Sequence, residues 1–204
     1  VFEAVALGIG GNKFYKKAFV DLDAKTLSGA TMVKVFDQMR KLKNYTDPGS
    51  PGRDWNIATG MVMEGKAAFQ IMGDWAKGEF AAAGMEPGKD YLCSPTPSNN
   101  GYLYNVDSFI FYKNAGKDKV EGQKLLASLI MGKNFQKVFN MYKGSIPARL
   151  DVSMDDFDMC AKKSNADLNT ASKKGGLMPS FAHGMALRGA QKGAIQDVVT
   201  DHFN

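Results

Sequence analysis

Trp75 is the first side chain in this sequence whose type and position suggest ligand chemistry. It follows a short apolar run, residues 67–72, and a Gly-Asp turn, which predicts a place at the carboxyl end of a strand. Open α/β sheets bind ligands at that end, and an indole ring there can stack on the apolar face of another ring. Packing in a core explains a tryptophan equally well.

Asp107 is a second candidate, because it lies in a run that alternates like a strand. The alternation of Tyr102–Tyr112 puts Asn105 and Asp107 on one face, between apolar side chains. A carboxylate on a buried face needs hydrogen-bond donors, which either the protein or a ligand must supply. A structural ion pair is the alternative interpretation.

Lys143 and His183 complete the set, although each also has a simpler interpretation. Lys143 is expected at the end of a helix before Gly144, where the helix dipole favours a cation and a surface lysine is ordinary. His183 is expected in the first turn of the last helix, as a neutral donor and acceptor or as a capping or packing residue. An indole, a carboxylate, an ammonium group and an imidazole together suit a polyhydroxylated ring, because hydroxyls both donate and accept.

Patterns typical of catalysis, metal binding and nucleotide binding are absent or incomplete. Gly60–Lys66 fits the start of a phosphate-binding loop, but Ala67 replaces the required hydroxyl and the run closes a helix. The sequence has no Gly-x-Ser-x-Gly elbow, and its two cysteines and two histidines lack metal-ligand spacing. We therefore predict no catalytic residue, no metal and no cofactor. Cys93 and Cys160 form either a disulfide or two buried thiols, and their separation does not decide between these.

The composition is typical of a globular protein. Of the 204 residues, 44% are hydrophobic and 23% are charged, and no apolar run reaches the roughly 20 residues of a membrane span. The net charge is +5, from 26 Lys and Arg against 21 Asp and Glu, but the lysines occur as pairs within amphipathic helices. We therefore do not expect nucleic acid as a partner.

Helices dominate the expected elements, with short strands between them, so the predicted fold class is α/β. Apolar periodicity and turn residues predict helices at 28–42, 54–65, 74–83, 119–131, 134–142, 155–174 and 180–204, and strands at 67–72 and 102–112. Trp55 is expected in the core, and Asp54 and Asp74 are expected to cap their helices. Turn-rich segments at 93–101 and 144–149 are candidate crossings between lobes.

Six segments give the sequence a resemblance to a known family. They are RDWNIA (53–58), IMGDWAKGEF (71–80), YNVDSF (104–109), YKGSIPAR (142–149), DVSMDDFDMCAKKS (151–164) and GAIQDVVT (193–200). The chain resembles the extracellular solute-binding proteins of bacterial sugar ABC transporters, and among them the C-terminal half of the periplasmic glucose-binding type. The similarity extends over almost the whole sequence, and the order of the segments is specific.

The resemblance implies a type II periplasmic-binding-protein fold, with two helix-rich α/β lobes that close about a hinge. The N-terminal lobe would be largely missing from this chain, so we expect a further N-terminal segment of the same protein as a partner. Residues 1–97 would form the first part of the C-terminal lobe, 98–146 would return to the hinge and the N-terminal lobe, and 147–204 would complete the C-terminal lobe. Relatives carry a disulfide, which implies a bond between Cys93 and Cys160.

The resemblance also implies a function without catalysis. Trp75 would stack on a glucose-type monosaccharide, and Asp107, Lys143 and His183 would bind its hydroxyls, with Asn105 as a weaker candidate. Galactose and mannose are alternative ligands. The protein would capture the sugar between its lobes in the periplasm and deliver it to an inner-membrane permease.

Two other functions remain alternatives on the sequence. A carbohydrate hydrolase lobe would use Asp107 and a second carboxylate as an acid–base pair, and the sequence offers no obvious second carboxylate. A structural or adhesive fragment would bind no ligand and would show no ligand-dependent closure.

Overall fold

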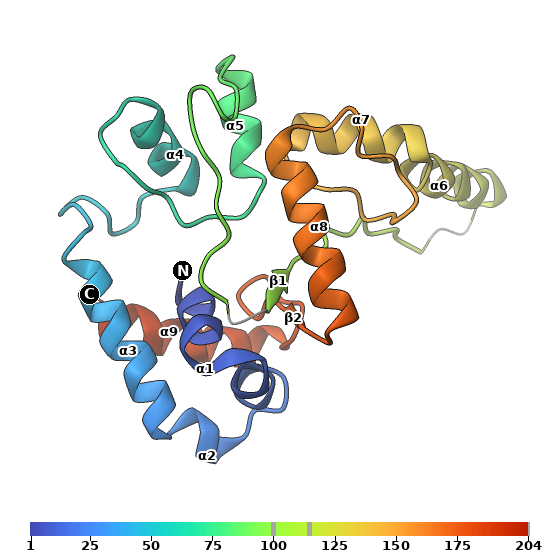
Figure 1. Cartoon of the computed structure of the whole chain (residues 1–204). Helices are drawn as coiled ribbons and strands as arrows, with labels where there is room; N and C mark the ends of the chain where they lie inside the picture. The colour runs from blue at the N-terminus through green and yellow to red at the C-terminus, as the bar shows by residue number, and fades with distance from the viewer. Residues whose placement is uncertain (99–100, 114–115, 204) are drawn as a thin grey trace.

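The computed structural model describes residues 1–98, 101–113 and 116–203, and helices account for most of them (Figure 1). The helices are α1 (Phe2–Phe19), α2 (Ala24–Leu27), α3 (Ala30–Lys43), α4 (Trp55–Met63), α5 (Ala76–Ala82), α6 (Lys117–Ile130), α7 (Lys133–Lys143), α8 (Met159–Lys173) and α9 (Gly189–Phe203). The strands are β1 (Tyr102–Tyr104) and β2 (Leu177–Pro179). The helix-rich α/β class predicted from the sequence is confirmed.

The two strands join segments that lie far apart in the chain. β1 and β2 run parallel, with Leu103 paired to Met178, and the backbone amides of Tyr102 and Ser180 extend the pairing at its two ends. Parallel strands need a long crossover, and here α6, α7 and α8 lie within it. In Figure 1 the strands occupy the middle of the molecule, between a lower group of helices (α1, α2, α3 and α9) and an upper group (α4 to α8).

The main apolar core lies in the lower group of helices. Its members come from α1, α3, β2 and the turn that follows β2, and the rings of Phe19 and Phe181 stack with their centroids 4.7 Å apart. The apolar face of α3 that the periodicity predicted is confirmed, since Val35 and Met39 are buried. This core fixes the turn after β2, on which His183 lies.

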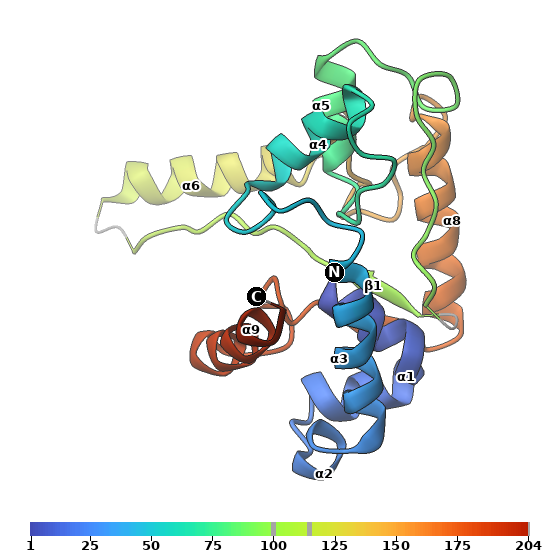
Figure 2. The same ribbon diagram turned by 90° about the vertical axis from the view of Figure 1, so that its left-hand side faces the viewer.

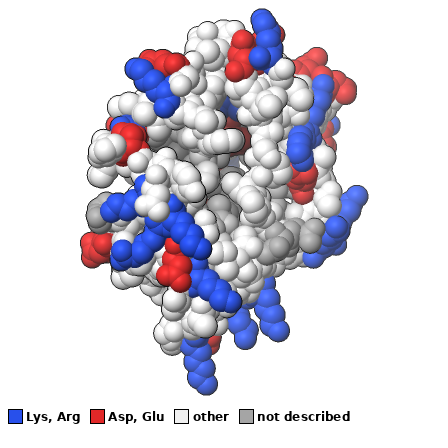
Figure 3. Space-filling model, turned by 60° about the vertical axis from the view of Figure 1, so that its left-hand side comes forward, with Lys and Arg blue, Asp and Glu red and all other residues white. Residues whose placement is uncertain are grey.

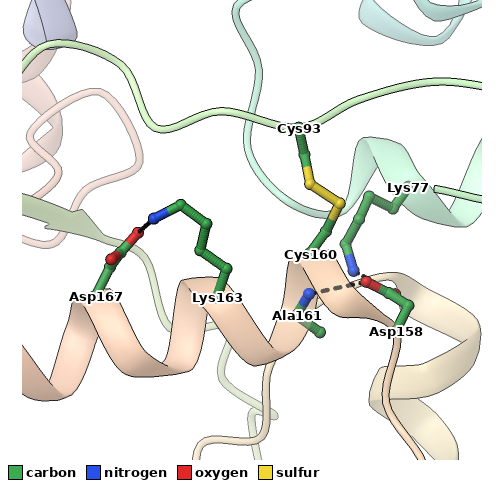
Figure 4. The surroundings of a disulfide bond; sticks show 7 residues. All are labelled: Lys77, Cys93, Asp158, Cys160, Ala161, Lys163 and Asp167. Carbon is green, nitrogen blue, oxygen red and sulfur yellow. Dashed lines mark hydrogen bonds and ion pairs between the residues drawn. A yellow bond between two sulfur atoms is a disulfide. The ribbon is translucent and has the colours of Figure 1, made fainter. Parts of the chain in front are cut away.

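Covalent and polar contacts hold the upper group together. A disulfide joins Cys93, in the connection after α5, to Cys160 in the first turn of α8, with the Cα atoms 6.0 Å apart (Figure 4). On the same side, Lys77 of α5 donates at 2.6 Å to Asp158, which also caps α8 by accepting from the Ala161 amide. The disulfide implied by the resemblance is therefore confirmed.

Two glycines let the start of α5 approach the end of α7. Gly144 ends α7 with a φ of 84°, a left-handed conformation that glycine adopts readily. A Cβ at Gly144 would lie 2.5 Å from the Gly78 nitrogen, and one at Gly78 would lie 2.9 Å from the Lys143 carbonyl oxygen. This close approach brings Lys143 next to α5 and to the turn that precedes it, where Trp75 lies.

Helix α6, which belongs to the upper group, and the segment 105–113 project away from the rest of the molecule (Figure 2). The segment follows β1 without pairing as a strand, and its side chains Phe109 and Ile110 are exposed. Leu125 and Leu129 of α6 are exposed as well. Large apolar patches on a protein surface are usually covered by another element or another protein.

Both strand predictions need correction. Residues 67–72 form no strand, and Phe69 is 90% exposed. The strand predicted at 102–112 ends at Tyr104. A strand forms only where a neighbour supplies hydrogen bonds, and among the described residues β1 finds its partner in β2 over three residues alone.

The prediction for Trp55 is wrong, and neither Asp54 nor Asp74 makes the expected side-chain capping bond. Trp55 is 39% exposed, because α4 packs mainly against α5 and lies outside the core. Asp54 stands at the start of α4 but makes no side-chain capping bond. Asp74 makes no capping bond either, because its carboxylate accepts from the Ser145 hydroxyl.

The helices predicted at 28–42, 119–131 and 134–142 are confirmed by α3, α6 and α7. The last two helices begin later than predicted, at Met159 and Gly189, because turns occupy the residues before them. His183 therefore lies in a turn and not in the first turn of a helix. None of the helices in the described ranges is long and apolar enough to cross a membrane.

Candidate functional site

Trp75 stands immediately before α5, with its ring against Gly73 and His183. A Cβ at Gly73 would lie 2.2 Å from Cζ3 of the indole, so the missing side chain makes room for this ring position. The Trp75 and His183 rings meet edge to face, with centroids 5.2 Å apart and planes at 72°. The indole is half-buried, so part of its surface stays available to another ring.

Asp107 lies in the segment after β1 and forms an ion pair with Lys143 at the end of α7. Asn105 donates to the other carboxylate oxygen at 3.2 Å. The hydrogen bond from Lys143 lowers the pKa of Asp107, and Asn105 and the nearby His183 act in the same direction. The predicted burial of Asp107 is wrong, because the chain leaves the strand at residue 104; its side chain is 62% exposed and can accept from a ligand.

His183 lies in the turn after β2, where polar contacts hold it. Its Nδ1 is 2.7 Å from the Ser180 hydroxyl oxygen, and its backbone amide donates to the same oxygen at 3.2 Å. Ser180 in turn donates to Glu3 of α1 at 2.7 Å. The side chain of His183 is 42% exposed, so the face of the ring away from Ser180 is open to a ligand.

Asp74, the residue before Trp75, joins the turn before α5 to the loop after α7. The Ser145 hydroxyl donates to its carboxylate at 3.1 Å. Burial raises the pKa of Asp74, while the hydrogen bond from Ser145 and the charges of Lys77 and Lys143 oppose the rise. Asp74 therefore supports the site from inside the protein.

The structure brings together all five residues that the sequence analysis named for a sugar site. An edge-to-face contact links the indole to the imidazole, and the ammonium and amide groups both bind the carboxylate. His183 also contributes to the lowered pKa of Asp107. The residues come from the turn before α5, the segment after β1, the end of α7 and the turn after β2. The cluster offers a ring, a donor and acceptors, a set that suits a sugar.

A buried polar group beside His183 was missed by the sequence analysis. Glu3 is 8% exposed and accepts from Ser180 and, at 3.2 Å, from the Tyr15 hydroxyl. Burial, followed by the charge of Glu3, raises the pKa of Tyr15 well above its usual value, so this hydroxyl stays protonated. The sequence does contain a signal for this buried group, because Glu3 lies within the apolar stretch at residues 1–7. A carboxylate that is buried with such a stretch needs a polar partner.

Other parts of the surface suit a sugar less well. Among the described residues, no group of three or more His, Cys, Asp and Glu could hold a metal ion. A cavity of about 510 Å³ lies between α1, α3 and α9, but its lining is mainly apolar and contains none of the five site residues. On the face shown in Figure 3, Lys and Arg side chains gather at the lower left and at the bottom of the view, with a few acidic side chains beside them.

Comparison with known proteins identifies the family of the chain. Residues 2–130 match the family described as bacterial extracellular solute-binding protein. The whole chain is 50% identical to a probable sugar-binding periplasmic protein of Brucella suis biovar 1 (strain 1330), of which it covers 48%. It is 49% identical to a protein of the same description from Rhizobium meliloti (strain 1021), of which it covers 49%.

A more distant relative is an uncharacterized ABC transporter extracellular-binding protein of Pyrococcus horikoshii. It is 32% identical over 98% of this chain, which covers 44% of the relative. The chain thus spans about half the length of the curated relatives that it matches. The family match itself extends over more than half of the chain, and we conclude that the chain belongs to the bacterial extracellular solute-binding protein family.

Proposed function

We propose that this chain is part of the sugar-binding component of a bacterial ABC import system. The observation that carries the proposal is the cluster of an indole, an imidazole, a carboxylate and an ammonium group in a member of a solute-binding family. The descriptions of the Brucella and Rhizobium relatives favour a sugar ligand and a periplasmic location. The description of the Pyrococcus relative favours an ABC transporter as partner. As a binding component the protein would release its ligand unchanged, so it is not an enzyme.

Each residue of the cluster has a role in this proposal. Trp75 stacks on the apolar face of a pyranose ring, and we expect a glucose-type monosaccharide, with galactose or mannose as alternatives. Lys143 donates to sugar oxygens, and Asp107 accepts from sugar hydroxyls. The ammonium group has three protons, so Lys143 can keep its bond to Asp107 and still bind the sugar. His183 adds a further polar contact, and Asn105 is the weaker candidate.

We also propose that the site is completed by an N-terminal segment of the same protein, of which this chain is the C-terminal half. Residues 1–97 and 147–204 would form one lobe of a two-lobe protein, and 98–146 would reach the hinge and the other lobe. The exposed apolar side chains of α6 and of the segment 105–113 are consistent with this, because such surface is normally covered. Closure of the lobes would bury the sugar and create the form that an inner-membrane permease binds.

A carbohydrate hydrolase is the less supported alternative. It would need a second carboxylate that faces the sugar together with Asp107. Glu3 is the carboxylate beside His183, but it is 8% exposed and its oxygens accept from Ser180 and Tyr15. It is therefore directed at the protein and not at a ligand.

Calorimetric titration of the intact protein, with its N-terminal segment, tests the proposal against D-glucose, galactose, mannose and maltose. We expect saturable binding that is tightest for glucose, with all sugars recovered unchanged. Lys143→Met should weaken glucose binding about tenfold or more, because a hydrogen bond to a charged group contributes about 1.5–3 kcal/mol. Lys34→Met, at an exposed position of α3, is the matched control and should have no effect. The absence of binding to all four sugars, or cleavage of a sugar by the protein, would overturn the proposal.

A further inference from the structure

Ser180 connects a buried carboxylate to the imidazole of His183, and the proposed function gives no part to either Ser180 or Glu3. The Ser180 oxygen lies 2.7 and 3.0 Å from the two carboxylate oxygens of Glu3 and 2.7 Å from Nδ1 of His183. Ser180 is 2% exposed and Glu3 is 8% exposed. The connection is therefore shielded from water and runs from α1 directly to a residue of the candidate site.

The direction of these hydrogen bonds follows from the protons available. Glu3 also accepts from the Tyr15 hydroxyl and from the Ala182 amide, as an ionised carboxylate does, and such a carboxylate cannot donate. The single hydroxyl proton of Ser180 is thus directed at Glu3. The Ser180 oxygen accepts from the His183 backbone amide and has a second lone pair. A contact of 2.7 Å between that oxygen and Nδ1 then requires a proton on Nδ1.

We propose that Glu3 and Ser180 hold neutral His183 in the Nδ1–H tautomer, so that Nε2 faces the ligand as a hydrogen-bond acceptor. Both are positioning residues, because they act on a ligand only through His183. Nε2 makes no hydrogen bond within the part of the chain that the structure describes, and the side chain is 42% exposed. The statement about the ligand rests on the proposed sugar-binding function, whereas the statement about the tautomer does not.

The tautomer determines which ligand groups the imidazole can bind. An unprotonated Nε2 accepts a hydrogen bond from a hydroxyl but cannot donate one to the lone pair of an ether oxygen. Lys143 contributes donors and Asp107 contributes an acceptor, and His183 adds a second acceptor beside the indole. A bound sugar must therefore direct hydroxyl protons at both Asp107 and His183, and an oxygen lone pair at Lys143.

Nitrogen NMR spectra of the labelled, intact, sugar-free protein read the tautomer directly. They are recorded at increasing pH until the imidazole nitrogen signals no longer change, so that the neutral form is observed. This 204-residue chain contains two histidines, and His202 serves as an internal reference once its signals are assigned. We expect a protonated Nδ1 and an unprotonated Nε2 for His183. A protonated Nε2 in the wild-type protein would overturn the proposal without the need for any variant.

Ser180→Ala and Glu3→Gln test the two positioning residues separately. The first variant removes the acceptor for the Nδ1 proton. In the second, the new amide can donate to Ser180, which frees the serine proton for Nδ1. In both variants we expect a mixture with the Nε2–H tautomer, while the spectrum of His202 stays unchanged. If both variants fold and His183 remains entirely in the Nδ1–H tautomer, the role of Glu3 and Ser180 is overturned.

Addition of D-glucose tests the role of Nε2 as an acceptor. Saturating glucose should shift the Nε2 signal of His183 and leave Nδ1 protonated, because a sugar hydroxyl then donates to Nε2. An Nε2 signal that does not move at saturation would overturn the acceptor role while the proposed function stands. If glucose and the other three sugars fail to bind, the acceptor role and the proposed function are both overturned, and the tautomer is decided by the sugar-free spectra.

Discussion

Gly73→Ala should displace the ring of Trp75 while leaving the fold intact. The added Cβ would lie between 2.2 and 2.5 Å from Cζ3, Cη2 and Cε3 of the indole. Carbon atoms in ordinary contact are about 3.5–4.0 Å apart, so the ring must withdraw by about 1 Å or more. These three atoms belong to the far end of a side chain, which can rotate away without a shift of the backbone.

We expect this displacement to weaken sugar binding about tenfold. An aromatic contact contributes about 0.5–1.5 kcal/mol beyond the area that it buries, and a tenfold change corresponds to about 1.4 kcal/mol. The free energy of unfolding should change by less than about 1 kcal/mol, because Gly73 does not have the positive φ that would strain an alanine. Trp75→Ala removes the ring altogether and should weaken binding by at least as much.

Calorimetry with D-glucose measures the affinity, and tryptophan fluorescence reports the position of the ring. In a Trp55→Phe background, Trp75 is the remaining tryptophan of this 204-residue chain, and the emission of the Gly73→Ala protein should lie at longer wavelength than that of its parent when the ring becomes more exposed. Gly122→Ala is the matched control, since a Cβ at that position of α6 meets nothing within 4 Å. A Gly73→Ala protein with shifted emission and unchanged glucose affinity would refute the stacking role of Trp75.

Three further predictions concern stability and pH. Cys93→Ser combined with Cys160→Ser should lower the free energy of unfolding by about 4 kcal/mol, because the disulfide spans a sequence separation of 67 residues. Denaturant unfolding measures this change, and a loss below about 1 kcal/mol would contradict the prediction. Lys77, which is 8% exposed, pairs with Asp158, and Lys77→Met leaves that carboxylate without its partner. The free energy of unfolding should fall by about 1–3 kcal/mol in thermal unfolding. An unchanged melting temperature would count against this prediction. Burial raises the pKa of Asp74, so ionisation of this carboxyl costs stability as the pH rises above its unfolded pKa of about 3.9. Asp74→Asn should therefore gain stability relative to wild type as the pH rises above that value, and parallel stability profiles would argue against the raised pKa.

The helices could be predicted because their signals are local. The apolar periodicity of α3, α6 and α7 and the glycine that ends α7 are all visible within a few turns of sequence. The strands could not be predicted in length, because pairing depends on a partner elsewhere in the chain. β1 meets β2 only after the chain has passed through three helices, and residues 67–72 meet no strand among the described residues.

The site residues could be named one by one, but their arrangement could not be predicted from the sequence. The position of Lys143 beside the turn that holds Trp75 depends on the close approach of α5 and α7 at two glycines. The position of His183 depends on a turn that the core holds, and the periodicity had placed it in a helix. Glu3 and Ser180 are separated by 177 residues, so no local pattern connects them.

A crystal structure of the intact protein with bound D-glucose tests the central claim most directly. The account predicts that the pyranose ring lies on the indole of Trp75, with sugar oxygens within hydrogen-bond distance of Asp107, Lys143 and His183. Glucose bound at another place, with Trp75 free of contact, would contradict the account.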